Sequence, residues 1–270
     1  MIVGVAVALW LDLAAVGPAI AALIGALLIQ IGTNFANDYY DFIRGGDTDE
    51  RIGPVRVTHA GILEPEQVRR GMVAVLGLAV AVGVYLVWVG GWPVLAIGVA
   101  SVACAVLYTG GPFPLAYHGL GDVFVFVFFG LVAVGGTYYV QGLSWPPDAW
   151  LAGVGLGALS TAILVVNNLR DIHTDAVAGK RTLAVRFGPA FARWEYAGAL
   201  AAASLLPLVF LATGEAGVAM VLTTLVMAAA VPSLRTVFTS RDAAALNRSL
   251  GATGGLLMLH AVLFSVGWLL

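Results

Sequence analysis

The chain has 270 residues, of which 60% are hydrophobic and only 10% are charged, and its mean hydropathy is +0.96. A soluble domain of this length carries about 25% charged residues, so this chain lacks the polar groups needed to cover a soluble surface. The composition therefore predicts a polytopic membrane protein. The single cysteine, Cys104, excludes an internal disulfide and argues against a thiolate metal site.

A membrane-spanning helix needs about 20 apolar residues. Apolar stretches near this length occur at residues 14–37, 68–89, 93–109, 121–141, 149–168, 194–213, 216–238 and 249–270. A ninth stretch, residues 1–11, is too short to span the membrane alone. We therefore expect one all-α domain over residues 1–270, a polytopic membrane helical bundle of about nine transmembrane helices around a central cavity, with the first helix short.

The 13 lysine and arginine residues all fall at one side of the membrane with this segmentation. The opposite connections contain Asp12, Asp148 and Glu215 but no cation. Because cytoplasmic loops carry the excess of Lys and Arg, we expect the cationic side of this cell-membrane protein to be cytoplasmic. Two polar sequences end the second and sixth spans on that same side, which predicts two halves that face one cavity.

The first polar sequence, NDYYDF, closes the second span at residues 37–42. Asn37 and Asp41 are four residues apart and share one face of a helix. Asp38 is adjacent to this face, and Asp47 follows in the loop. A single acidic helix end of this kind is usually an interfacial anchor, so its interpretation depends on the second sequence.

The second polar sequence, NNLRDIHTD, closes the sixth span at residues 167–175. Asn168, Asp171 and Asp175 follow at i, i+3 and i+7, which places them on one helical stripe. Like charges this close to a membrane require neutralising cations. Oxygen ligands select a hard ion, and Mg²⁺ favours one or two carboxylates together with substrate phosphates. Two opposed stripes therefore predict a pair of Mg²⁺ ions that hold a diphosphate.

The loops after the two polar sequences supply cations. Arg51 and Arg56 follow the first in ERIGPVR, and Lys180 and Arg181 follow the second in AGKRTLAVRFG. Guanidinium groups bind phosphate oxygens in a bidentate fork, and lysine acts as a point charge. Tyr108, at the cytoplasmic end of the fourth span, is equally consistent with a substrate contact and with a packing residue.

The two polar sequences and their loops resemble the aspartate-rich motifs of the UbiA superfamily of intramembrane prenyltransferases. They are most similar to its MenA branch, the 1,4-dihydroxy-2-naphthoate polyprenyltransferases, which share the long spacing Asn37-xxx-Asp41-xxxxx-Asp47. The block YTGGPFPLAYHGLGD…TYYVQ at residues 108–141 adds a third match. Two departures stand out: Phe113 replaces a residue that is often basic in relatives, and the first helix is shorter than usual, as if the start were trimmed or one cavity wall were short.

The resemblance implies an Mg²⁺-dependent enzyme that transfers a polyprenyl group from an allylic polyprenyl diphosphate to 1,4-dihydroxy-2-naphthoate. The reaction would release CO₂ and diphosphate and give demethylmenaquinone. The metal ligands implied are Asn37, Asp41, Asp47, Asn168, Asp171 and Asp175. The catalytic acids implied are Asp38, Asp41, Asp171 and Asp175, with Asp38 either orienting the ligand shell or deprotonating the acceptor. The residues implied to bind diphosphate or acceptor are Arg51, Arg56, Tyr108, Lys180 and Arg181.

Two alternatives remain at the level of sequence. One is another aromatic acceptor, such as 4-hydroxybenzoate, homogentisate or a chlorophyll precursor. The other is a cation-coupled transporter that uses the intramembrane acids. Transporters more often place such residues near the midplane on broken helices, whereas these residues lie at helix ends beside loop cations. The expected partners are the two substrates and the lipid bilayer, with no nucleic acid, and the sequence determines neither prenyl chain length nor oligomeric state.

Overall fold

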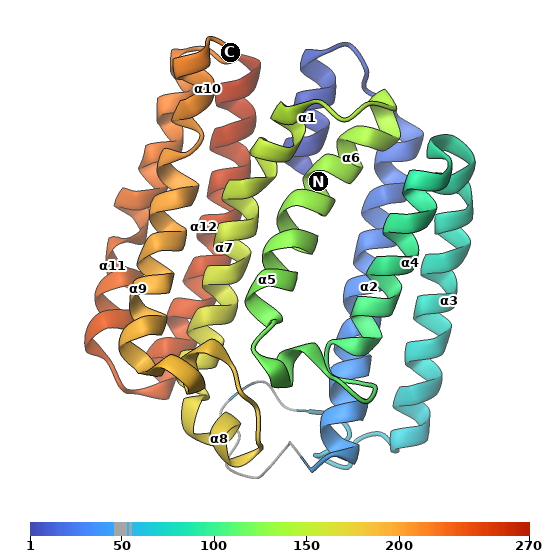
Figure 1. The fold of residues 1–270 in the computed structure, drawn as a ribbon, viewed down its shortest axis with the longest axis vertical. Helices are drawn as coiled ribbons and strands as arrows, with labels where there is room; N and C mark the ends of the chain where they lie inside the picture. Colours follow the sequence, from blue (N-terminus) through green and yellow to red (C-terminus); the bar gives the residue numbers. More distant parts are fainter. Residues whose placement is uncertain (46–52, 54–55) are drawn as a thin grey trace.

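The computed structural model describes residues 1–45, 53 and 56–270, and this part of the chain is helical without strands (Figure 1). The longer helices are α2 (Val16–Ile43), α3 (Pro65–Gly90), α4 (Trp92–Leu107), α7 (Pro147–Arg170), α9 (Leu183–Leu205), α11 (Leu225–Thr239) and α12 (Ala243–Leu269). The shorter ones are α1 (Ile2–Trp10), η1 (Leu115–His118), α5 (Gly121–Val125), η2 (Phe126–Val132), α6 (Ala133–Gly142), α8 (Ile172–Val177), α10 (Leu208–Thr213) and η3 (Val218–Thr224). The all-α prediction is confirmed.

Seven helical segments of the described chain are long and apolar enough to cross a membrane. They are Val16–Ile43, Pro65–Gly90, Gly121–Gly142, Pro147–Arg170, Leu183–Thr213, Val218–Thr239 and Ala243–Leu269. The shorter apolar helix α4 occupies the predicted span at residues 93–109. Helix α1 has nine residues and rises about 14 Å, so it is too short to span alone, as predicted. Each of the nine predicted stretches therefore corresponds to helix, and the chain is a multi-pass membrane protein.

One span begins eleven residues earlier than the predicted residue 194. The hydroxyl of Thr182 caps the start of α9 by accepting a hydrogen bond from the Val185 amide at 3.3 Å. Gly188 then breaks the helix with φ 85° and ψ 172°, and Pro189 restarts it. The Gly-Pro pair and the nearby arginines give this first part of α9 the composition of a loop. For this reason the hydropathy of the sequence predicts a later start for the helix.

The helices form two groups joined by a central segment (Figure 1). On one side α2 packs against α3 and α4. On the other, α7 packs against α9 and α12, and α11 packs against α9 and α12. The segment α5–η2–α6 lies between them, contacting α7 through η2 and α2 through α6. The largest buried apolar cluster belongs to the second group, with α7 at its centre.

The π-helical segment η2 approaches α7 through glycines. A Cβ atom on Gly130 would lie 2.5 Å from the Cα of Gly157 and 2.7 Å from the carbonyl oxygen of Gly153. Real Cβ atoms do not approach backbone this closely, so the contact requires glycine on both helices. Small residues of this kind let membrane helices pack without a hydrophobic driving force.

The connections α2–α3, α7–α9 and α11–α12 lie at one end of the bundle, the lower end in Figure 1. The connections α1–α2, α3–α4 and α6–α7 lie at the other. Both polar sequences therefore meet at one end, as their order along the chain predicts. The central cavity stays a prediction. Two open hollows on the described surface lie elsewhere, at η3 and between α11 and α12.

Candidate active site

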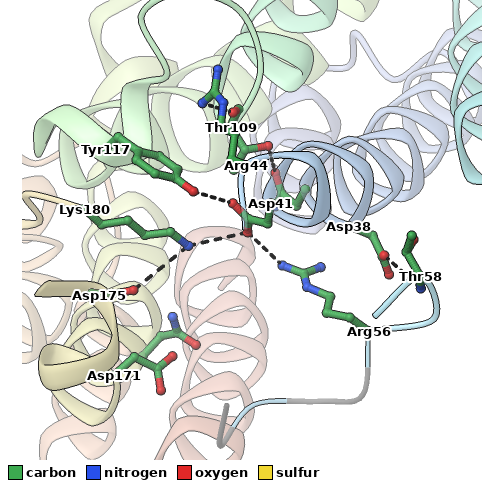
Figure 2. Close-up of polar contacts among 12 residues, drawn as sticks. Asp38, Asp41, Arg44, Arg56, Thr58, Thr109, Tyr117, Asp171, Asp175 and Lys180 are labelled. Atoms are coloured by element: carbon green, nitrogen blue, oxygen red, sulfur yellow. Dashed lines mark hydrogen bonds and ion pairs between the residues drawn. The ribbon is translucent and has the colours of Figure 1, made fainter. Parts of the chain in front are cut away.

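Asp41 is the meeting point of the polar residues at this end of the bundle (Figure 2). It lies in the last turn of α2 and is only 2% exposed. Its Oδ1 accepts a hydrogen bond from the Tyr117 hydroxyl at 3.0 Å. Its Oδ2 lies 3.4 Å from Lys180 Nζ and 3.5 Å from Arg56 Nη2. Asp41 is therefore a buried carboxylate neutralised by two cations from separate loops.

Lys180 links the two polar sequences. Its Nζ lies 3.4 Å from Asp41 Oδ2 and 4.0 Å from Asp175 Oδ1. The turn that ends α8 sets this placement, with Gly179 in the left-handed region at φ 74°. The Lys180 amide donates to the Asp175 carbonyl at 2.8 Å and the Gly179 amide to the Ala176 carbonyl at 3.2 Å, which is a Schellman motif. The motif folds Lys180 back beside the helix that carries Asp175.

Asp175 is mostly buried and lies near several charged side chains. Burial raises the pKa of Asp175 from 3.8 to about 6, while Lys180 lowers it and the negative charges of Asp171 and Asp41 raise it. Asp175 is therefore ionised at neutral pH but takes up a proton in mildly acidic solution. A bound divalent cation would favour the ionised form in the same way as Lys180 does.

The helix that carries the second polar sequence is interrupted at Asp171, between Asn168 and Asp175. Helix α7 ends at Arg170, Asp171 has φ −95° and ψ 10°, and α8 starts at Ile172. Asp171 is bound by Arg170 instead, with Nε to Oδ1 at 2.7 Å and Nη2 to Oδ2 at 2.5 Å. The Asp175 amide still donates to the Asp171 carbonyl at 2.8 Å, so the two residues stay one turn apart across the interruption. The bidentate guanidinium pair holds Asp171 at the point where α7 ends.

The guanidinium of Arg170 has two further partners. Its Nη2 donates to Asn167 Oδ1 at 2.8 Å, and its Nη1 donates to Asn247 Oδ1 of α12 at 2.7 Å. The Arg170 side chain is only 1% exposed. In the sequence Arg170 is one of 13 cations on the predicted cytoplasmic side, whereas in the structure it holds Asp171 and ties α7 to α12.

Asp38 holds the loop that follows the first polar sequence. Its Oδ2 accepts from the Val57 amide at 3.0 Å and its Oδ1 from the Thr58 amide at 3.2 Å. Both oxygens therefore bind backbone rather than point to the cations around Asp41. Of the two roles predicted for Asp38, this geometry favours orienting the site over deprotonating an acceptor. Asp38 fixes the loop from which Arg56 reaches Asp41 (Figure 2).

The connection between α4 and α5 belongs to the third matching block of the sequence, and it contributes residues that were not among the predicted ligands or substrate contacts. Asn37 Oδ1 accepts from the Thr109 hydroxyl at 2.9 Å. Arg44 Nη1 donates to the Thr109 carbonyl at 2.6 Å, and its Nη2 donates to the Gly111 carbonyl. The amide of Arg181 donates to the Tyr117 carbonyl at 3.0 Å. This connection therefore bridges the two polar sequences, and its position between two spans on the cationic side is the pattern that could have revealed it.

The remaining predicted residues are less tightly gathered. Asn168 is buried near the end of α7, and the side chain of Arg181 is exposed. Tyr108 lies close enough to Asp41 and Asp175 for their negative charges to act on its hydroxyl group. Phe113 is 54% exposed and stacks on His118 with ring centroids 3.6 Å apart. Asp47 and Arg51 lie outside the described residues.

The donor set fits a hard divalent cation. Asp41 and Asp175 come from different helices and converge on one positive charge, that of Lys180. Within the described ranges, no three His, Cys, Asp or Glu side chains gather closely enough to hold a metal alone. Mg²⁺ prefers one or two protein carboxylates, with phosphate oxygens completing its coordination shell. Asn37, Asn168 and Asp171 supply further oxygens at the same end.

The family assignment follows from comparison with known proteins. A model of the UbiA prenyltransferase family matches residues 1–264. The chain belongs to the UbiA prenyltransferase family. The Mycobacterium tuberculosis UbiA relative named 1,4-dihydroxy-2-naphthoate octaprenyltransferase is 44% identical over 86% of this chain and 80% of its own length. A protein of the same name from Haemophilus influenzae is 35% identical over 93% of this chain and 83% of its own length.

Solved UbiA structures share the fold. A UbiA homolog from Archaeoglobus fulgidus, bound to DMAPP and Mg²⁺, superposes with a TM-score of 0.63 at 15% identity and covers 98% of this chain and 94% of its own. A digeranylgeranylglyceryl phosphate synthase superposes with a TM-score of 0.57 at 14% identity, covering 93% of each chain. At these identities the likeness concerns the fold, and it confirms a helical membrane bundle of the UbiA type.

Proposed function

We propose that this chain transfers a polyprenyl group from an allylic polyprenyl diphosphate to 1,4-dihydroxy-2-naphthoate, releasing CO₂ and diphosphate and forming demethylmenaquinone. The observation that carries the proposal is the similarity, over 86–93% of this chain, to relatives named 1,4-dihydroxy-2-naphthoate octaprenyltransferase, at 35–44% identity in Mycobacterium tuberculosis and Haemophilus influenzae. The convergence of Asp41, Lys180 and Asp175 supports it, since it brings carboxylates and a phosphate-binding cation to one point.

Two Mg²⁺ ions are part of the proposal, with Asp41 and Asp175 as the central ligands. Asn37, Asn168 and Asp171 are assigned as further ligands, and Asp47 keeps the role that the resemblance gives it. When bound, Mg²⁺ would neutralise the negative charge that develops on the leaving diphosphate. The chain's own contribution is to hold oxygen ligands from α2 and from the α7–α8 region at one end of the bundle.

Lys180 and Arg56 are assigned to the diphosphate. Both neutralise Asp41 in this structure and lie on loops, so they can turn to phosphate oxygens once another cation balances Asp41. Arg51 and Arg181 remain predicted partners of the diphosphate or of the acceptor carboxylate, and Tyr108 of either substrate. The apolar helices around the site would keep water from the allylic cation, which water would otherwise capture. The cationic end of the bundle, and with it the mouth of the site, is assigned to the cytoplasm.

The test is a screen of acceptors with purified protein, Mg²⁺ and a polyprenyl diphosphate. We expect CO₂ and diphosphate release in equal amounts with 1,4-dihydroxy-2-naphthoate, and neither product with Asp41→Asn. Prenylation of 4-hydroxybenzoate or homogentisate instead would reassign the acceptor. Absence of diphosphate release with every acceptor, together with cation flux in proteoliposomes, would favour the transporter alternative and overturn the enzymatic proposal.

A further inference from the structure

Tyr117 contacts an acid and two bases of the site with one side chain. Its hydroxyl donates to Asp41 Oδ1 at 3.0 Å. Its ring centroid lies 5.4 Å from Arg44 Cζ and 5.2 Å from Lys180 Nζ, both within the range of a cation–π interaction. Figure 2 shows Arg44 above the Tyr117 ring and Lys180 below it. Tyr117 comes from η1, so it belongs to neither polar sequence.

The hydroxyl of Tyr117 divides the two oxygens of Asp41 between different partners. Oδ1 faces Tyr117, whereas Oδ2 faces Lys180 and Arg56 at 3.4 Å and 3.5 Å. A carboxylate held through one oxygen has lost much of its rotational freedom. The other oxygen is therefore presented in a fixed direction to whatever positive charge lies opposite. Partners that orient a metal ligand in this way typically contribute a tenfold to hundredfold gain in metal affinity.

The ring of Tyr117 acts on Lys180. A lysine ammonium sits on a flexible stem and would otherwise sample many positions. The residue is held at both ends, because the Arg181 amide donates to the Tyr117 carbonyl at 3.0 Å and the Tyr117 hydroxyl donates to Asp41 at 3.0 Å. Arg44, on the other side of the ring, is anchored by the carbonyls of Thr109 and Gly111. Lys180 therefore meets a rigid aromatic surface beside both Asp41 and Asp175.

We propose that Tyr117 is a positioning residue with two separable roles: its hydroxyl presets Asp41 for a divalent cation, and its ring presets Lys180 for a diphosphate. The second role rests on the proposed function, because it assigns Lys180 to a substrate phosphate. The first role depends only on the geometry around Asp41. The two roles predict different consequences for variants that remove the hydroxyl alone and variants that remove the ring as well.

The test measures binding without turnover. Calorimetry in detergent gives the Kd of Mg²⁺ alone, and then the Kd of a non-hydrolysable polyprenyl thiodiphosphate in saturating Mg²⁺. For Tyr117→Phe we expect the Mg²⁺ Kd to rise about tenfold, with the thiodiphosphate Kd within about twofold of the wild type because the ring is kept. For Tyr117→Leu we expect the same weakening of Mg²⁺ binding and a further rise of about threefold to fivefold in the thiodiphosphate Kd.

The matched control is Tyr138→Phe, which removes another buried hydroxyl, bonded to Ser144 Oγ at 3.3 Å at the far end of α6. It should leave both constants unchanged. If Tyr117→Leu does not fold, Tyr117→Met fills more of the space and still lacks a ring. An unchanged Mg²⁺ Kd in Tyr117→Phe overturns the hydroxyl's role, and equal thiodiphosphate affinity in the Phe and Leu (or Met) variants overturns the ring's role. Because binding is measured directly, these outcomes are distinct from a failure of wild-type turnover, which would contradict the proposed function.

Discussion

Lys180 occupies the space between Asp41 and Asp175, where the proposed Mg²⁺ ligands converge. A buried carboxylate without a counterion is strongly unfavourable, so the cations that we assign to the diphosphate also stabilise the free protein. Asp175 is less well neutralised than Asp41, because its Oδ1 lies 4.0 Å from Lys180 Nζ. Burial dominates there and raises the pKa of Asp175 to about 6.

This pKa should make the proposed Mg²⁺ binding sensitive to pH. Above pH 6 Asp175 is ionised and can accept a cation, whereas below pH 6 the cation must displace a proton. The apparent Mg²⁺ affinity should therefore be flat near pH 7.5 and fall by about tenfold per unit below pH 6. Calorimetry in buffers of different ionisation enthalpy should show uptake of about one proton by the buffer at pH 5.5. Asp175→Asn should remove this proton release, and an unchanged release in that variant would contradict the assignment.

At the scale of helices, the decisive feature is the end of α7. The polar sequence has the spacing of one helical stripe, but Arg170 satisfies Asp171 locally and the helix stops. A guanidinium that forms a bidentate pair with the carboxylate of the next residue can stabilise the end of a helix. Both charged groups are then paired without any contact from a further helical turn. The same guanidinium reaches Asn247, so the break also joins α7 to α12.

Arg170→Met tests this junction. It removes one partner of a largely buried ion pair and leaves Asp171 unpaired, which should lower the free energy of unfolding by about 3–5 kcal/mol. Arg170→Lys should restore only part of this, because lysine cannot form the fork. Thermal and denaturant unfolding in detergent measure the effect. Arg70→Met, which changes an arginine whose side chain is 77% exposed, is the control and should unfold like the wild type.

The contact between η2 and α7 makes a second prediction at this scale. Gly130→Ala would place a methyl group 2.5 Å from the Cα of Gly157, so the helices must separate. Overpacking of this kind should lower the free energy of unfolding by about 1–3 kcal/mol. Gly136→Ala lies on the adjoining helix with nothing within 4 Å of the new Cβ, and should leave stability unchanged or slightly raised. Equal behaviour of the two variants in unfolding experiments would show that the close approach is not needed.

At the scale of the whole molecule, the described connections that carry the cations lie at one end of the bundle, and the positive-inside rule predicts that this end is cytoplasmic. In a Cys104→Ser background, Glu215→Cys and Arg241→Cys place one exposed thiol at each end. A membrane-impermeant maleimide should label Glu215→Cys in intact cells and Arg241→Cys only after permeabilisation. The reverse pattern would invert the proposed orientation and place the site outside the cytoplasm.

Hydropathy by itself determined the helical class, the nine apolar stretches and the gathering of the cations at one end, because membrane spans are set by composition over about 20 residues. Residue spacing also identified Asp41, Asp175 and Lys180, since chemistry-bearing residues are costly near lipid and stand out. Only the tertiary structure decided how they are joined. It put Tyr117 beside Asp41 across 76 residues of chain, turned Asp38 toward the backbone of its own loop, and ended α7 at Arg170. The first outcome depends on which side chains meet when distant segments pack, and the other two on side-chain hydrogen bonds at helix ends. Periodicity along one helix carries no information about either.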